Sequence, residues 1–341
     1  MNRRVFIQAV SAFVPAKAQR PERPSREPRP VDLASLRLCI VTMKGVPWKL
    51  EDNFVRMESR VRQGAKSGAQ LVIAPECILD GYVCCTDRHT TKERMMAIAQ
   101  TVPDGIYIAR ARSLSRELGI YLIFGFLEKS GGELFNSCML VDPRGEIIGK
   151  YSKVNPSEES YITPGRELKP INTPLGRVGF LICSDRWVPE NFRVLSVLGA
   201  QIVFLPMDGI GGPEHTLMLR QRALDNYCWI IVANTWCCTI VDPRGKVWLE
   251  KYEEECVTLS TLGISEPLKN LKRDRMISRR PDLYAPLTKS FEAQARYDEK
   301  GGITPFEEEK RTQFLLKIPV GADTKGNCTT CYKAPPPTPV P

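Results

Sequence analysis

Three side chains with nucleophilic or acid–base chemistry stand where apolar, strand-like runs end. Cys183 follows VGFLI, Glu76 follows LVIAP, and Lys153 follows EIIGKYS. Sites in open α/β sheets collect where strands end, so these three positions could meet in one site. A cysteine is usually a buried structural residue. A nucleophilic cysteine needs surroundings that stabilise its thiolate, and two charged residues, Asp185 and Arg186, follow Cys183 after one serine.

Each position also has an ordinary explanation when it is taken alone. A glutamate after a proline is usually a loop residue, and a lysine at a strand end is usually solvated. The chain has only two histidines, His89 and His215, which argues against a papain-like pairing of cysteine with imidazole. Cys328 and Cys331 form a single CxxC near the tail, and a zinc site would need two further ligands. We therefore predict no metal site.

Alternating strand-like and helix-like segments must position these side chains. Strand-like runs lie at 37–45, 71–75, 121–128, 178–184, 201–206 and 229–235, and helix-like ones at 48–69, 106–118, 189–199 and 214–227. Two hairpins share the turn sequence VDPRG and join 135–142 to 146–153 and 239–242 to 246–251. A mixture of this kind predicts a layered α/β protein.

Composition excludes several classes of protein. The 341 residues are 43% hydrophobic and 26% charged, as in soluble globular proteins, and no apolar run is long enough to span a bilayer. Of the net charge of +9, residues 1–30 carry +5, from six Arg and one Lys against two Glu. The remaining chain is weakly basic and has no DNA or RNA recognition motif, so we predict no nucleic-acid partner. The scatter of its twelve cysteines does not indicate a small disulfide scaffold.

The chain ends differ in composition from the centre. Residues 1–18 begin with paired arginines and end in Ala-Lys-Ala, which resembles a twin-arginine export signal, although a disordered basic leader explains the same residues. Residues 19–34 read as a Pro/Arg-rich linker, 288–320 as a C-terminal extension and 321–341 as a disordered Pro-rich tail. Export would place the protein in the periplasm or outside the cell; otherwise it is cytoplasmic. The globular domain is expected at 35–287.

That domain resembles the nitrilase, or carbon–nitrogen hydrolase, superfamily. The resemblance covers about residues 36–287, and its carriers are LVIAPEC with DGY, FNSCMLVDPRGEIIGKYSKV, ITPG, VGFLICSDRWVPENFRVLSVLGA, RQRALDNYCWIIVANT and RRPDLY. It implies a four-layer α-β-β-α sandwich that pairs into an α-β-β-α-α-β-β-α dimer. It also implies a catalytic triad of Glu76 as general base, Lys153 as oxyanion stabiliser and Cys183 as nucleophile, with the backbone N–H of Ser184 completing the oxyanion site.

The same resemblance implies a second active-site glutamate before the Pro-Gly of ITPG. Glu158 stands at the matching distance, and Glu159 is the alternative if the alignment slips by one residue. Asp185, Arg186 and Glu190 match the segment after the nucleophile, and we expect them to be supporting residues outside the chemistry. No metal or organic cofactor is implied.

Some residues depart from the family pattern and leave the substrate open. Asn155 stands where many members have a histidine, and the segment that follows Lys153 is short. The predicted function is hydrolysis of a small amide or N-carbamoyl compound, and the CSDRWVPENFR stretch leans towards N-carbamoyl substrates. A nitrilase acting on a nitrile, or a non-catalytic binding protein on the same scaffold, are the alternatives. The expected partners are therefore a small amide, carbamoyl or nitrile substrate and a second copy of the chain, in a homodimer or higher homo-oligomer.

Overall fold

The computed structural model describes residues 32, 34–87, 89–156, 159–264, 276–288, 296–297 and 303–304. The predicted signal at 1–18, the tail at 321–341 and the Cys328/Cys331 pair lie outside these residues. Export of the protein therefore stays a prediction.

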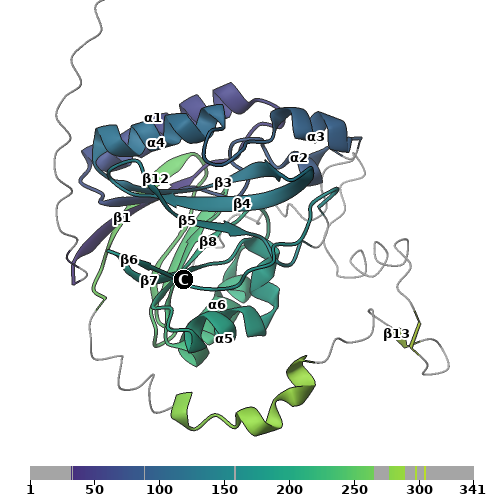
Figure 1. Ribbon diagram of the computed structural model, residues 1–341. Helices are drawn as coiled ribbons and strands as arrows, with labels where there is room; N and C mark the ends of the chain where they lie inside the picture. Colours follow the sequence, from purple (N-terminus) through teal and green to yellow (C-terminus); the bar gives the residue numbers. More distant parts are fainter. Residues whose placement is uncertain are drawn as a thin grey trace, which may run out of the picture.

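Two six-stranded mixed sheets form the centre of the molecule (Figure 1). The first sheet has the strand order β12 (Cys256–Leu262), β1 (Leu36–Thr42), β2 (Leu71–Ile73), β3 (Tyr121–Ser130), β4 (Glu133–Val141) and β5 (Ile147–Ser152). The second has the order β11 (Val247–Tyr252), β10 (Cys237–Val241), β9 (Trp229–Ala233), β8 (Ile202–Pro206), β7 (Gly176–Phe180) and β6 (Ile171–Thr173). The central strands β1–β2–β3 and β7–β8–β9 run parallel, so their carboxyl ends lie at a common edge of each sheet.

Helices cover the outer faces of both sheets (Figure 1). The helices before β3 are α1 (Leu50–Lys66), α2 (Val83–Thr86), α3 (Lys92–Ile98) and α4 (Ile106–Leu118), and those in the second half are α5 (Pro189–Val197) and α6 (Pro213–Asn226). Phe54, Met57 and Val61 form the buried stripe of α1, which packs on the first sheet. Helix α4 is followed by Gly119, whose positive φ of 66° fits a left-handed helix cap.

The central strands of both sheets are buried on both faces, which explains why they read as continuous apolar runs. In β1, Leu38 and Ile40 pack between the two sheets, whereas Cys39 and Val41 pack under the helices. Phe180 of β7 belongs to the same inter-sheet core. The result is the predicted four-layer α-β-β-α sandwich.

The structure adds elements that the hydrophobic pattern did not predict. Strand β12 returns to the first sheet and pairs antiparallel with β1 as a half-exposed edge strand. Because polar residues alternate along it, it lacks the continuous apolar run of a central strand. The strand expected at 178–184 ends at Phe180, and Cys183–Trp187 form a 3-10 helix, η1. Among the helices of the described ranges, none is long and apolar enough to cross a membrane.

Candidate active site

The nucleophile candidate lies in a tight turn after a parallel strand. The chain leaves β7 at Phe180 and enters η1 at Cys183, whose φ is 43°. A positive φ is uncommon for a residue with a Cβ, and such conformations cluster at functional sites. The Asp185 carboxylate accepts the backbone N–H of Ile182 at 2.9 Å, and the Asp185 N–H donates back to the Ile182 carbonyl at 3.0 Å. These bonds fix the turn that presents the sulfur.

Glu76 lies in the loop after β2 and is almost fully buried. Its Oε1 accepts hydrogen bonds from Lys153 Nζ at 2.8 Å and Asn136 Nδ2 at 2.7 Å. Its Oε2 accepts the backbone N–H of Asp208 at 2.8 Å. Because a carboxylate accepts hydrogen bonds through both oxygens, these donors fix its orientation as well as stabilising its charge.

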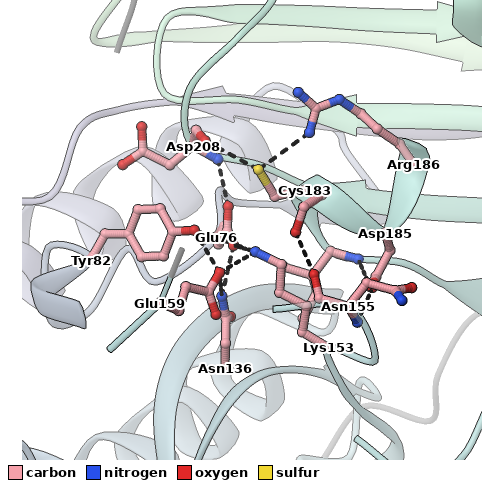
Figure 2. A network of polar contacts seen from close by, with 12 residues as sticks. Glu76, Tyr82, Asn136, Lys153, Asn155, Glu159, Cys183, Asp185, Arg186 and Asp208 are labelled. Carbon is pink, nitrogen blue, oxygen red and sulfur yellow. Dashed lines mark hydrogen bonds and ion pairs between the residues drawn. The ribbon is translucent and has the colours of Figure 1, made fainter. Parts of the chain in front are cut away.

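Lys153 follows β5 and is also buried. Its ammonium contacts Glu76 and Glu159 and lies 3.3 Å from the Tyr82 hydroxyl (Figure 2). Burial alone would lower the pKa of Lys153, but the carboxylates of Glu159 and Glu76 outweigh burial and raise that pKa well above its usual value. Lys153 is therefore a fixed positive charge at neutral pH.

A second glutamate joins this cluster, and it is Glu159. Three donors converge on Glu159 Oε1: Lys153 Nζ, the Tyr82 hydroxyl at 2.6 Å and Asn136 Nδ2 at 3.2 Å. Its Oε2 is buried and has no hydrogen-bond partner among the described residues. Burial raises the pKa of Glu159, and Lys153 opposes that rise. Glu158, the residue favoured from the sequence, lies outside the described residues, and the alternative Glu159 is the one seen among the site residues.

The Cys183 sulfur has one acceptor and one donor. Its thiol donates to the Asp208 carbonyl at 3.2 Å, and Arg186 Nη1 approaches the sulfur at 3.3 Å (Figure 2). Burial is the main cause that raises the pKa of Cys183 to about 12, with Glu76 adding to it and Lys153 opposing it. The resting group is thus a thiol at neutral pH, which needs a base before it can attack.

The backbone of Asp208 connects the base candidate to the nucleophile candidate. Its N–H binds Glu76 and its carbonyl accepts the Cys183 thiol, so one peptide segment after β8 holds both groups. Its own side chain accepts from the Thr235 hydroxyl at 3.1 Å. Glu76 and Lys153 thus follow strands of the first sheet, whereas Cys183 follows a strand of the second sheet. The three residues meet between the two sheets.

Arg186 is buried without a carboxylate partner among the described residues. The residue is 1% exposed; within the described ranges, its Nη2 reaches only the Ile210 carbonyl at 3.5 Å and its Nε has no partner. The guanidinium lies 4.5 Å from the centre of the Trp187 ring, which is half-exposed. Burying an unpaired cation is costly, so this charge is available for an anion that enters the site.

The structure therefore brings Glu76, Lys153 and Cys183 together. Ser184 lies beside Cys183 at the start of η1, and its hydroxyl donates to the Asn155 carbonyl at 2.7 Å. Glu190 is exposed on α5. Sequence reasoning placed Arg186 among residues outside the chemistry, whereas its guanidinium touches the sulfur itself.

Sequence reasoning also missed three residues that hold the polar cluster, Tyr82, Asn136 and Asp208. Tyr82 and Asn136 lie in the family-like stretches DGY and FNSC, so the resemblance could have pointed to these two positions. Only the fold shows which groups their side chains contact. Within the described ranges, no group of three or more histidine, cysteine, aspartate or glutamate side chains could hold a metal ion.

Comparison with known proteins gives consistent results. The model of the carbon-nitrogen hydrolase family matches residues 33–262. A nitrilase of Pyrococcus abyssi is 32% identical over 202 residues, covering 58% of this chain and 74% of the relative. The human omega-amidase NIT2 is 27% identical over 281 residues, covering 74% of this chain and 98% of the relative.

Solved structures show the same fold. A carbon-nitrogen hydrolase from Helicobacter pylori G27 matches with a TM-score of 0.65 at 20% identity, covering 75% of this chain and 99% of that one. The family match spans more than half of the chain and includes Glu76, Lys153 and Cys183. This chain therefore belongs to the carbon–nitrogen hydrolase family and is an enzyme that hydrolyses carbon–nitrogen bonds.

Proposed function

We propose that this enzyme hydrolyses a small amide or N-carbamoyl compound that carries an anionic group, through an acyl-enzyme on Cys183. The observation that carries the proposal is that the buried Cys183 thiol lies close to Glu76, to Lys153 and to the guanidinium of Arg186, which has no carboxylate partner among the described residues. Each group supplies a different part of the reaction.

Attack begins with proton removal from the thiol. The Cys183 pKa of about 12 leaves little thiolate at neutral pH, so a neighbouring base has to take the proton as the sulfur attacks. Glu76 is the carboxylate that shares the Asp208 peptide with Cys183. The sulfur bonds to the substrate carbonyl carbon, and the thiol proton moves to Glu76.

The tetrahedral intermediate places negative charge on the former carbonyl oxygen. Lys153 is a buried, permanently charged donor for that oxygen, and the backbone N–H of Ser184 is the second donor of the proposed oxyanion site. Collapse breaks the C–N bond, and Glu76 returns its proton to the departing nitrogen. Ammonia or an amine leaves, and a thioester remains on Cys183.

Water then completes the cycle. Glu76 removes a proton from water, the hydroxyl attacks the thioester carbon, and the same donors stabilise the second oxyanion. The C–S bond breaks, the acid leaves, and the sulfur recovers its proton from Glu76. Overall, one water is consumed for each C–N bond cleaved.

Arg186 supports an anionic substrate. Its nearly complete burial is an energetic cost that a substrate carboxylate would offset through a charge-assisted, two-pronged hydrogen bond. Because Nη1 already lies beside the sulfur, the anionic group would sit a short distance from the scissile bond. Substrates with the anion close to the amide or carbamoyl group fit this arrangement.

The test is ammonia or amine release from matched pairs of substrates. The panel contains ω-amides and N-carbamoyl amino acids, the methyl ester of each, and simple aliphatic amides and nitriles. We expect release from acidic amides or carbamoyl compounds at least tenfold faster, in kcat/KM, than from their esters. Cys183→Ala should fold and release nothing above background.

Arg186 variants separate the two parts of the proposal. Arg186→Met should reduce the acid-to-ester ratio of kcat/KM to near one, and Arg186→Lys should keep part of it. Equal turnover of acids and esters by the wild type would contradict the anionic group. Turnover that persists in Cys183→Ala would contradict the mechanism. Release from nitriles alone would point to the nitrilase alternative.

A further inference from the structure

We propose that Asp185 is a positioning residue that fixes Lys153 relative to Cys183 and so sets the geometry of the oxyanion site. The inference rests on the proposed function of Lys153 and Cys183. Asp185 lies two residues after the nucleophile, on η1, and its side chain is fully buried. It contacts the chain segment on both sides of Lys153.

The first half of the connection runs to the end of β5. The Tyr151 hydroxyl donates to Asp185 Oδ2 at 2.7 Å, and the Asn155 backbone N–H donates to Asp185 Oδ1 at 2.8 Å. Tyr151 and Asn155 stand two residues before and two residues after Lys153. One carboxylate thus holds the lysine segment at two points, with Lys153 midway between them.

The second half of the connection runs to the nucleophile turn. Asp185 Oδ2 also accepts the Ile182 N–H at 2.9 Å, directly before Cys183. The same carboxylate therefore fixes the turn of the second sheet and the lysine segment of the first sheet. A buried carboxylate with three short donors is rigid, because no rotation keeps all three bonds.

Two neighbouring side chains strengthen this connection. Asn191 Nδ2 donates to Asn155 Oδ1 at 2.7 Å and to the Asp185 carbonyl at 2.9 Å, and the Ser184 hydroxyl donates to the Asn155 carbonyl at 2.7 Å. Asn155, which replaces the histidine common in the family, thus uses its backbone N–H, its carbonyl and its side chain to bind the segment 184–191. We call this set the Asp185 junction: Asp185, Tyr151, Asn155, Asn191 and Ser184.

Among the described residues, the Lys153 ammonium makes no direct hydrogen bond with the nucleophile turn. Its partners within the described part of the chain are Glu76, Tyr82 and Glu159, all in the first half of the chain. Glu76 reaches the second sheet through Asp208, which places the base. The Asp185 junction therefore ties the backbone on both sides of Lys153 directly to the nucleophile turn, whereas the route through Glu76 and Asp208 to the Cys183 sulfur is indirect. An oxyanion donor must be held to within about 0.5 Å, and we assign that task to the direct connection.

The experiment compares three reactions of Cys183 that differ in their need for the oxyanion site. Amide or carbamoyl hydrolysis needs it. Reversible addition of butyraldehyde needs it too, because the S–C bond forms while the carbonyl oxygen gains negative charge and then the thiol proton. Alkylation by iodoacetamide does not, because the thiol loses its proton, the sulfur bonds to carbon, and iodide leaves without any oxyanion. Aldehyde affinity is read as protection of Cys183 from alkylation, followed by mass spectrometry.

The central variant is Tyr151→Phe, which removes one hydroxyl and leaves the Ile182 N–H on the same oxygen. We expect kcat to fall about tenfold with KM within twofold, aldehyde protection to weaken about tenfold, and the alkylation rate to stay within twofold. Asn191→Ala should have the same effects. The double variant Tyr151→Phe/Asn191→Ala should lose more of both the kcat and the aldehyde protection. Tyr121→Phe, a buried tyrosine of β3, is the matched control and should leave all three reactions unchanged.

Two results would overturn the proposal. One is a wild-type kcat and aldehyde affinity in folded Tyr151→Phe and Asn191→Ala. The other is an alkylation rate that falls in parallel with turnover, which would mean that these residues only support the thiol. If the wild type hydrolyses no compound in the panel, the proposed function fails, yet the aldehyde and alkylation measurements still decide the role of the junction.

Discussion

At the scale of single residues, the site concentrates charge among buried side chains. Glu76, Glu159 and Lys153 are each almost completely buried at the side chain. Burying charges is costly unless they are paired and hydrogen-bonded, and here the lysine lies between two carboxylates that also receive the Asn136 amide. Removal of Lys153 would leave two buried carboxylates without a cation, and removal of either glutamate would leave the lysine with one carboxylate and the Asn136 amide with one acceptor fewer. Single substitutions in this cluster should therefore reduce both folding and catalysis.

Asp80 allows a test of stability that is separate from catalysis. It is buried, and its oxygens accept the backbone N–H groups of Val83 at 3.2 Å and Leu127 at 3.1 Å. Burial raises its pKa to about 7 in spite of these bonds. The folded protein therefore keeps a proton on Asp80 between about pH 4 and 7 that the unfolded chain has lost. This contribution to stability is complete below pH 4 and is lost as the pH rises to 7.

The prediction concerns the difference between wild type and Asp80→Asn. Between pH 4 and 7 the variant should gain free energy of unfolding relative to wild type by about 1.4 kcal/mol per pH unit, and the difference should level off above pH 7. Urea unfolding at several pH values measures it, and titration of other groups cancels in the comparison. A difference that stays constant from pH 4 to 8 would show that Asp80 is ionised throughout.

Residue identities in the site were only partly predictable. Glu76, Lys153 and Cys183 stand at strand ends inside recognisable blocks, so both pattern and resemblance pointed to them. Glu159 could not be separated from its neighbour, because adjacent positions in a loop differ by less than the uncertainty of alignment. The position of Arg186 against the sulfur depends on the curvature of η1, and no periodicity encodes that turn.

At the scale of elements, the reactive groups lie at strand ends, and close contacts between backbone segments fix the positions of the loops that carry them. Gly125 of β3 lies directly against the loop that carries Glu76, and its N–H donates to the Pro75 carbonyl at 3.0 Å. A Cβ at position 125 would lie 2.5 Å from the Cys77 nitrogen and 2.7 Å from the Glu76 Cα. These are backbone atoms, so the loop would have to move.

Gly125→Ala should therefore displace the base while the sheet persists. We expect kcat to fall about a hundredfold, since a displacement of about 1 Å has effects of this size, and the free energy of unfolding to fall by about 1–3 kcal/mol. Steady-state kinetics and urea unfolding measure the two effects. Gly263→Ala is the control, because its Cβ would meet only the Ala34 carbonyl at 3.5 Å. Equal kcat values for the two variants would contradict this role of Gly125.

The order of the elements was largely readable from sequence, and the missing parts have physical reasons. The buried parallel strands are strongly apolar and bounded by turns, so their patterns are clear. Strand β12 is half-exposed and pairs with β1, more than 200 positions earlier in the chain, and local pattern carries no information about that partner. The helices α2 and α3 are too short for their periodicity to be distinctive.

At the scale of the whole molecule, the two helix layers differ in their exposed surfaces. On the layer over the second sheet, α5 and α6 contact each other, and the two helices with the cap residue of α5 expose Val194, Val197, Leu198, Leu217 and Leu224. Apolar residues gathered on neighbouring helices are typical of surfaces that bind another protein. The outer layer of the first sheet exposes fewer of them on its long helices, chiefly Val55 on α1 and Ile106 on α4.

The family resemblance implied a homodimer, and we predict from the exposed apolar residues that its interface is formed by α5 and α6. Val197 is 47% exposed and Leu217 is 64% exposed, and a lysine at either position would place an unpaired charge in such an interface. Val197→Lys and Leu217→Lys should halve the mass measured by size-exclusion chromatography with light scattering. Val55→Lys, at a residue 50% exposed on α1, should leave the dimer intact. A wild type that is monomeric at micromolar concentration would contradict the homodimer. Dissociation by Val55→Lys alone would place the interface elsewhere.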